Sequence, residues 1–279
     1  MKTSIAKLAL GLTLVSMSGV AMAGIAATKH NLGASNTAGS NHTDATTEIC
    51  VFCHTPHGGD ITAAVPLWNR HLSSNVTYTT YSSLGTSTLD SASAAIGSVS
   101  LACLSCHDGT QAMDVMINTP GSDTTGQLPS GTMSGPNGWE EFQAMSNLTT
   151  DDMVYLGTDL RNDHPISIQY AGALTGGSFA RAANDLDFFT ATAAPAALSG
   201  TVVYYIEADG VGGKSKHDLP LYNRAGGTVT STGLNLQLLT GQPLVECATC
   251  HDPHTQNTTF LRHPSGNNGS ATCLTCHNK

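Results

Sequence analysis

The eight cysteines of this sequence form four C-x-x-C pairs, and a histidine directly follows each pair. In chain order the resulting motifs are Cys50/Cys53/His54, Cys103/Cys106/His107, Cys247/Cys250/His251 and Cys273/Cys276/His277. On one helical turn, residues three apart lie on the same face. Both thiols can then bond to one planar group, and the histidine falls beneath that group, where its imidazole can bind a metal.

Three other kinds of cysteine site compete with this interpretation. Disulfides are usual in exported chains, but they give no reason for a histidine after every pair. Structural zinc needs two such half-sites per ion and does not need histidine at the next position. A thioredoxin-like pair belongs to a βαβ unit, which is absent here. C-x-x-C-H is the attachment motif of c-type haem, so the sequence predicts four covalently attached haem c groups.

Two of the remaining histidines follow a motif at a matching position. His57 ends CVFCHTPH (50–57), and His254 ends CATCHDPH (247–254). Each is too near its own motif to wrap around to the opposite side of the haem attached there, but it can bind the next haem. The preceding proline, Pro56 or Pro253, stiffens this connection because its φ angle is fixed. We therefore expect both histidines to be distal haem ligands.

The other two distal ligands are expected at His30, in TKHN, and at His164, in LRNDHP. The remaining histidines lie in polar stretches, and each is expected to be solvated: His42, His71, His217 and His263. Of these, His71 and His263 are the best substitutes for a favoured distal ligand. Histidine on both sides of an iron leaves no open position for a substrate. The sequence thus favours an electron-transfer protein with no catalytic residues over two alternatives: a reductase with one open haem, and an electron-supplying subunit of a larger redox complex.

The first 23 residues have the features of a secretory signal. A basic start precedes a short apolar run, and Ala21-Met22-Ala23 forms an A-x-A cleavage site. We expect export to the periplasm or the cell exterior, with no membrane span after cleavage. The chain has 20 acidic against 11 basic residues, a formal net charge of −9. That balance argues against nucleic acid as a partner, because phosphate binding needs clustered lysine and arginine.

The motifs divide the chain into four predicted regions. These are the signal peptide (1–23), the first motif pair (24–110), a Gly/Ser/Thr-rich connecting region with a distal ligand (111–244) and the second motif pair (245–279). Strands are expected at 201–206, before the turn Asp209-Gly210, and at 234–239. Only 5% of residues are aromatic, so side chains alone make a poor core. We expect mostly irregular chain with short helices at the motifs, a few β-hairpins and a core formed by four haems.

The chain resembles the multihaem c-type cytochromes with doubled CxxCH motifs of metal-reducing bacteria. The resemblance is carried by TKHN (28–31), ICVFCHTPHGG (49–59), AVPLWNR (64–70), CLSCHDG (103–109), LGTDLRNDHPIS (156–167), VECATCHDPH (245–254), FLR (260–262) and ATCLTCHNK (271–279). It implies an exported electron carrier with bis-histidine haems and the distal ligands His30, His57, His164 and His254. The motif order is also similar to that of tetrahaem cytochromes that polymerise into extracellular filaments. This similarity implies a homopolymer in which a histidine of one subunit, here His30, binds a neighbour's haem.

Overall fold

The computed structural model describes eleven stretches of the chain, and the fold below refers to them alone. They are residues 24–39, 41–72, 75–87, 89, 91–113, 115–120, 133–134, 154–172, 185–195, 202–222 and 243–279. The predicted signal peptide and the expected strand at 234–239 lie outside these residues. Within them, short helices and short strands are joined by long irregular segments, as the sequence predicts.

A short helix forms at each of the four CxxCH motifs, which confirms the predicted attachment helices. They are the 3-10 helix η2 (Cys50–Phe52) and the α-helices α2 (Ser98–His107), α3 (Cys247–Cys250) and α4 (Ala271–Cys276). In the first motif the His54 backbone N–H donates to the Cys50 carbonyl at 2.8 Å. The equivalent bond from His251 to Cys247 measures 3.1 Å. Each of these motifs thus closes one helical turn, which sets its cysteines on one side.

The strands form three small antiparallel sheets. In the largest, β5 (Val202–Ile206) lies between β4 (Thr192–Pro195) and β6 (Leu219–Leu221). The others pair β1 (His42–Thr43) with β2 (Met133–Ser134), and β3 (Ile168–Gln169) with β7 (Leu244–Val245). The expected strand at 201–206 is confirmed as β5. Gly210, in the predicted turn after it, has φ +70°, a conformation that glycine adopts without strain.

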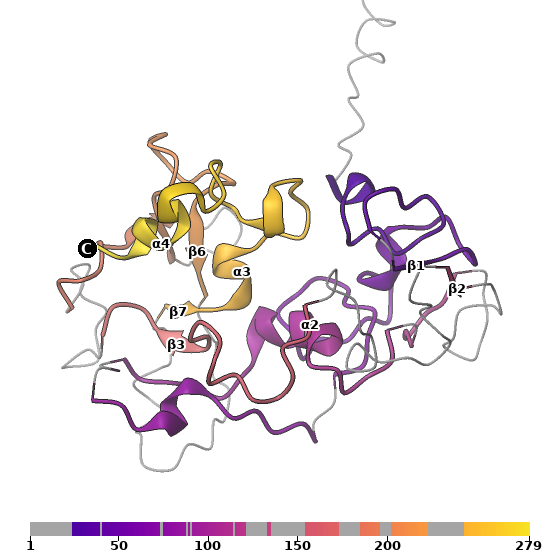
Figure 1. Ribbon diagram of the computed structural model, residues 1–279, viewed down its shortest axis with the longest axis horizontal. Helices are drawn as coiled ribbons and strands as arrows, with labels where there is room; N and C mark the ends of the chain where they lie inside the picture. Colours follow the sequence, from indigo (N-terminus) through magenta and orange to yellow (C-terminus); the bar gives the residue numbers. More distant parts are fainter. Residues whose placement is uncertain are drawn as a thin grey trace, which may run out of the picture.

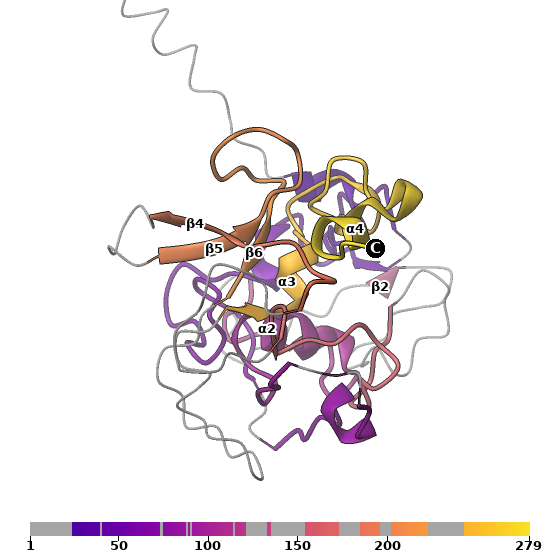
Figure 2. The ribbon, with the colours of Figure 1, turned by 90° about the vertical axis from the view of Figure 1, so that its left-hand side faces the viewer.

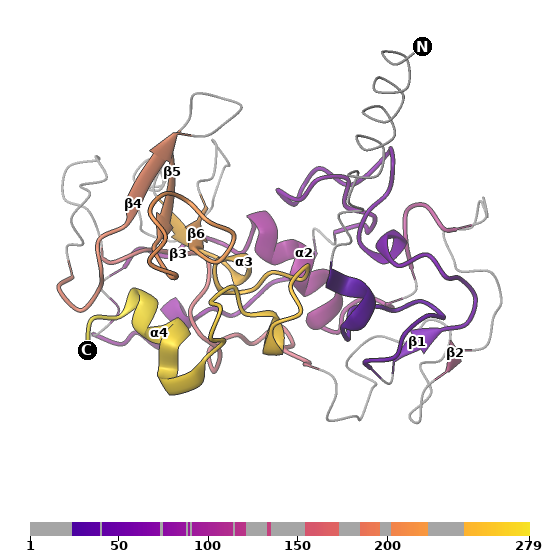
Figure 3. The ribbon, with the colours of Figure 1, turned by 90° about the horizontal axis from the view of Figure 1, so that it is seen from above.

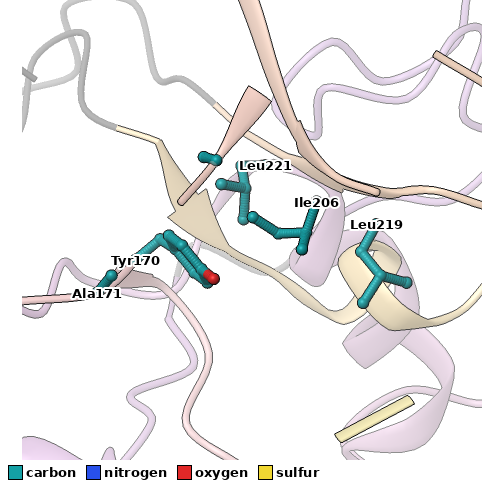
Figure 4. Packing of buried hydrophobic residues seen from close by; sticks show 6 residues of the cluster. Tyr170, Ala171, Ile206, Leu219 and Leu221 are labelled. Carbon is teal, nitrogen blue, oxygen red and sulfur yellow. The ribbon is translucent and has the colours of Figure 1, made fainter. Parts of the chain in front are cut away.

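The apolar interior of the described chain is divided into small clusters. The one with most members packs Ile206, Leu219 and Leu221 of the sheet against Tyr170 and Ala171 (Figure 4). Three smaller ones lie around Phe52, Trp68 and Leu244. Such dispersed clusters bury little apolar area each, and burial of apolar area is the main stabilising contribution in most folds. The divided interior agrees with a chain short of aromatic side chains.

The motif helices follow one another along the longest dimension of the molecule. Both Figure 1 and Figure 3 show α4, α3 and α2 in succession, with the N-terminal segment that carries β1 at the far end. The sheet of β4, β5 and β6 lies beside this row, and β6 packs against α3 (Figure 2). Four further 3-10 turns are η1 (Gly24–Ala27), η3 (Tyr81–Leu84), η6 (Thr258–Phe260) and η7 (Asn268–Ser270). Searched over its described residues, the chain has no helix long and apolar enough to cross a bilayer.

Candidate haem-attachment sites

All eight cysteines carry free thiols in the structure. Among the described residues, the one group of three metal-ligating side chains within 4.8 Å of each other is Glu207, Asp209 and Asp218, which contains neither cysteine nor histidine. The thiols therefore remain available for bonds to a cofactor.

Three of the four motif histidines are oriented as metal ligands. Nδ1 of His54 donates to the Pro66 carbonyl at 2.8 Å, and Nδ1 of His107 donates to the Val154 carbonyl at 2.7 Å. Nδ1 of His251 likewise donates to the Thr259 carbonyl, at 2.8 Å. A carbonyl only accepts, so Nδ1 carries the proton and Nε2 keeps a free lone pair. Bonds of this kind fix the tautomer and the ring orientation of metal-bound histidines.

Two of these rings face an imidazole from a remote part of the chain. The ring centroids of His54 and His254 are 6.2 Å apart with an interplanar angle of 15°. Those of His107 and His30 are also 6.2 Å apart, at 54°. An imidazole nitrogen binds a first-row metal at about 2 Å, so two rings on opposite sides of one iron have centroids about 6 Å apart. The residues present therefore fit a haem iron held by two histidines.

The electrostatics of both facing rings suit a ligand role. Burial, reinforced by the nearby rings of His107, His251 and His254, lowers the pKa of His30 to about 4, so its imidazole is neutral near pH 7. His30 is also held flat against Phe260, with ring centroids 4.2 Å apart. The ring of His254 is oriented by a carboxylate instead, because its Nδ1 lies 3.1 Å from an oxygen of Asp252. This bond raises the pKa of His254. Nε2 of His254 remains free.

The fourth motif has a neighbouring imidazole as well. Burial lowers the pKa of His277, and the next contribution in size comes from His164. His164 is exposed, and its Nδ1 contacts the adjacent Pro165 carbonyl at 3.0 Å. The structure thus associates His277 with one of the distal ligands predicted from sequence.

The third motif and the last predicted distal ligand are not brought together. His57 is exposed and has no ring contact within the described chain. His251 has no stacked or tilted imidazole opposite it in those residues. His251 contributes to the lowered pKa values of His30 and His107, which already face each other. Within the residues that the structure describes, the site of His251 therefore has no facing imidazole.

Hydrogen bonds show which of the other histidines keep a nitrogen free for a metal, a distinction that the sequence does not make. Nδ1 of His217 donates to the Arg262 carbonyl at 3.0 Å, which leaves its Nε2 free as in the motif histidines. Nδ1 of His263 instead accepts from the Ser265 backbone N–H at 3.1 Å, so its Nε2 carries the proton. His71 is exposed. The structure therefore adds His217 to the candidates, although its polar sequence context gave no signal.

The attachment cysteines of successive motifs approach one another. Cys53 and Cys106 both pack against the cluster around Phe52, and burial followed by Cys106 raises the pKa of Cys53 to about 12. Cys103 lies beside Cys247, and this neighbour together with burial raises the pKa of Cys103 well above its ordinary value. The first three motifs thus meet in chain order.

The same continuity extends to the last motif. Burial raises the pKa of Cys250 to about 11, and Cys273 is the next cause. Cys276 shows the reciprocal effect, since burial and then Cys250 raise its pKa to about 12. Neighbouring cysteines therefore link the four attachment sites in chain order.

Comparison with known proteins agrees with this picture. The family model described as "Doubled CXXCH motif" matches residues 242–279, which contain the third and fourth motifs. No curated protein matches the chain. The matched motifs indicate covalently bound haem c, and a doubled CXXCH motif is consistent with a multihaem c-type cytochrome that transfers electrons.

Proposed function

We propose that this chain is an exported tetrahaem c-type cytochrome that carries electrons through bis-histidine haems. The observation that carries the proposal is the pair of 6.2 Å imidazole separations, His54 with His254 and His107 with His30. When bound, haem c supplies the Fe(III)/Fe(II) couple. At the sites of His54 and His107, the facing side chains would hold the iron from both sides and leave no position for a substrate. Histidine on both sides also keeps the potential lower than a methionine ligand does.

The continuous series of attachment sites supports transfer along the chain. Electrons enter at one end of the row of helices and leave at the other, to redox protein partners or an extracellular acceptor. Contacts between cysteines of successive motifs, such as Cys103 and Cys247, keep neighbouring haems close.

Mass spectrometry of the exported protein tests the haem count. We expect the polypeptide beginning at Gly24 plus four covalent haem masses. Replacement of Cys273 and Cys276 by alanine should remove one haem mass, because both thioether bonds of the fourth motif are lost. The same double replacement at Cys50 and Cys53 is the matched variant and should also leave three haems. The bare polypeptide mass in the unmodified protein would contradict the proposal.

We further propose that the exported protein polymerises into filaments through a shared haem site. The resemblance noted from the sequence suggested His30 as the ligand given to a neighbour. His30 lies against His107 of its own chain, so the exposed His57 is the better candidate. The site of His251 is the matching acceptor, because the described chain offers it no facing imidazole.

Electron microscopy of secreted material tests the filament. We expect filaments from the natural sequence and monomers from His57→Ala. His217→Ala is the control for the alternative in which the chain completes the His251 site itself, and it should leave filaments intact. Monomers alone at high concentration of the natural protein would refute the shared site.

A second candidate function rests on the same His251 site. If no histidine covers it, the iron there is open, and the protein is a reductase for a small oxyanion fed by the other three haems. Carbon monoxide binding by the reduced protein separates the two functions. One bound equivalent in the assembled state supports the enzyme, whereas no binding supports the electron carrier.

A further inference from the structure

Two buried N–H donors of one short segment have no acceptor among the described residues. They are Nε1 of Trp68 and Nε of Arg70. Both side chains are buried, Trp68 to 8% and Arg70 to 1% exposure. A buried donor without a partner costs about 1–3 kcal/mol, and more when it is charged. Two such donors two residues apart indicate an acceptor that is not part of the polypeptide.

The charge of Arg70 strengthens this indication. A guanidinium stays protonated in proteins, and a buried charge normally needs a counter-charge. Within the described residues, no carboxylate forms an ion pair with Arg70. Its other nitrogens donate to neutral carbonyls of Ser105, Ala112 and Met113, at 3.1, 2.7 and 2.8 Å. The Ser105 carbonyl belongs to the last turn of α2, where a cation is favourable. Binding of the carbonyls accounts for the hydrogen bonds of the two terminal nitrogens of Arg70, but it leaves Nε without an acceptor.

The segment lies between the first two attachment sites. Asn69 N–H donates to the Cys53 carbonyl at 2.9 Å, which fixes the segment against the first motif. Trp68 contacts Cys53 and Ala102, the residue before the second motif, and lies edge-on to His54 at 6.1 Å between ring centroids. The free donors are therefore beside the positions where the first two haems are attached.

We propose that Trp68 and Arg70 bind a propionate carboxylate of one of these two haems. This inference rests on the proposed haem attachment. A carboxylate supplies both missing features, the acceptor oxygens and the negative charge. Charge-assisted bonds from a guanidinium to a carboxylate are about twice as strong as neutral ones. The positive charge of Arg70 stabilises the ferrous state of the adjacent iron and so raises its potential.

Substitutions at Arg70 test the charge. In the haem-loaded protein, Arg70→Gln should lower at least one of the four midpoint potentials measured by spectroelectrochemistry. Arg70→Lys keeps the charge and should restore most of the original value, which a purely structural role of the guanidinium fork would not do. Arg161→Gln is the matched control, because Arg161 is exposed and paired with Asp159. It should leave all four potentials unchanged.

Trp68→Phe removes the second donor while keeping the charge of Arg70 and an aromatic ring in the cluster. We expect a shift of a propionate bending mode in the resonance Raman spectrum, with the spin state unchanged. If Arg70→Gln does not acquire its haems, Trp68→Phe alone tests whether the segment binds a propionate. Unchanged propionate modes in Trp68→Phe, or unchanged potentials in Arg70→Gln, with four haems attached, would overturn the inference and leave water as the acceptor. A natural protein without haem would instead refute the proposed function.

Discussion

Replacement of His30 by alanine should convert one low-spin haem to a high-spin, five-coordinate one. His30 faces His107 at 6.2 Å between ring centroids, and burial keeps its imidazole neutral. Without it the iron held by His107 loses its second ligand and gains an open position. The reduced variant should therefore bind about one equivalent of carbon monoxide more than the natural protein. Electron paramagnetic resonance of the oxidised form should show a high-spin signal from that haem alone.

His263→Ala is the matched control for this prediction. His263 is half-buried like His30, but its Nδ1 accepts a backbone hydrogen bond, so its Nε2 is protonated and unsuited to iron. This variant should keep the spin state and carbon monoxide binding of the natural protein. An unchanged low-spin spectrum in His30→Ala, or a high-spin signal in His263→Ala, would contradict the pairing of His30 with His107.

The sequence predicted those parts of the fold that depend on neighbouring residues. Each CxxCH motif requires a helical turn, and a helix or 3-10 turn is present at all four. The run 201–206, rich in β-branched and aromatic residues, forms β5 in front of the turn at Gly210. Such features depend on the backbone preferences of neighbouring residues, so a short stretch of sequence is enough to predict them.

The pairing of the histidines was not predictable in this way. His254 follows the third motif yet faces His54 of the first, and His30 faces His107 across a separation of many residues. These pairs depend on how the loops are arranged in space, and no periodic pattern in the sequence predicts that arrangement. The donors of Trp68 and Arg70 were also missed, because an unsatisfied hydrogen bond is visible only when the surrounding atoms are in place.

The buried carboxylate of Glu246 gives the second large expected effect, on stability. Glu246 is 1% exposed, and its Oε2 accepts hydroxyl bonds from Ser100 at 2.5 Å and Ser167 at 3.0 Å. The Ser100 oxygen also accepts from the Cys247 backbone N–H at 3.0 Å. This group therefore joins α2, which carries the second motif, to α3, which carries the third. Glu246→Ala should cost about 3 kcal/mol of unfolding free energy, because it leaves two buried hydroxyls without their acceptor.

Urea denaturation followed by far-ultraviolet circular dichroism measures this cost in the haem-loaded protein. Glu246→Gln keeps the volume and one acceptor oxygen, so it should cost less than half as much as Glu246→Ala. Glu48→Ala is the control, because Glu48 is exposed, and it should shift the midpoint little. Equal midpoints for Glu246→Ala and Glu48→Ala would show that the bonds between α2 and α3 contribute nothing. The expected loss also affects the proposed haem sites, since these bonds hold Cys103 near Cys247 and so set the spacing of the haems proposed at the second and third motifs.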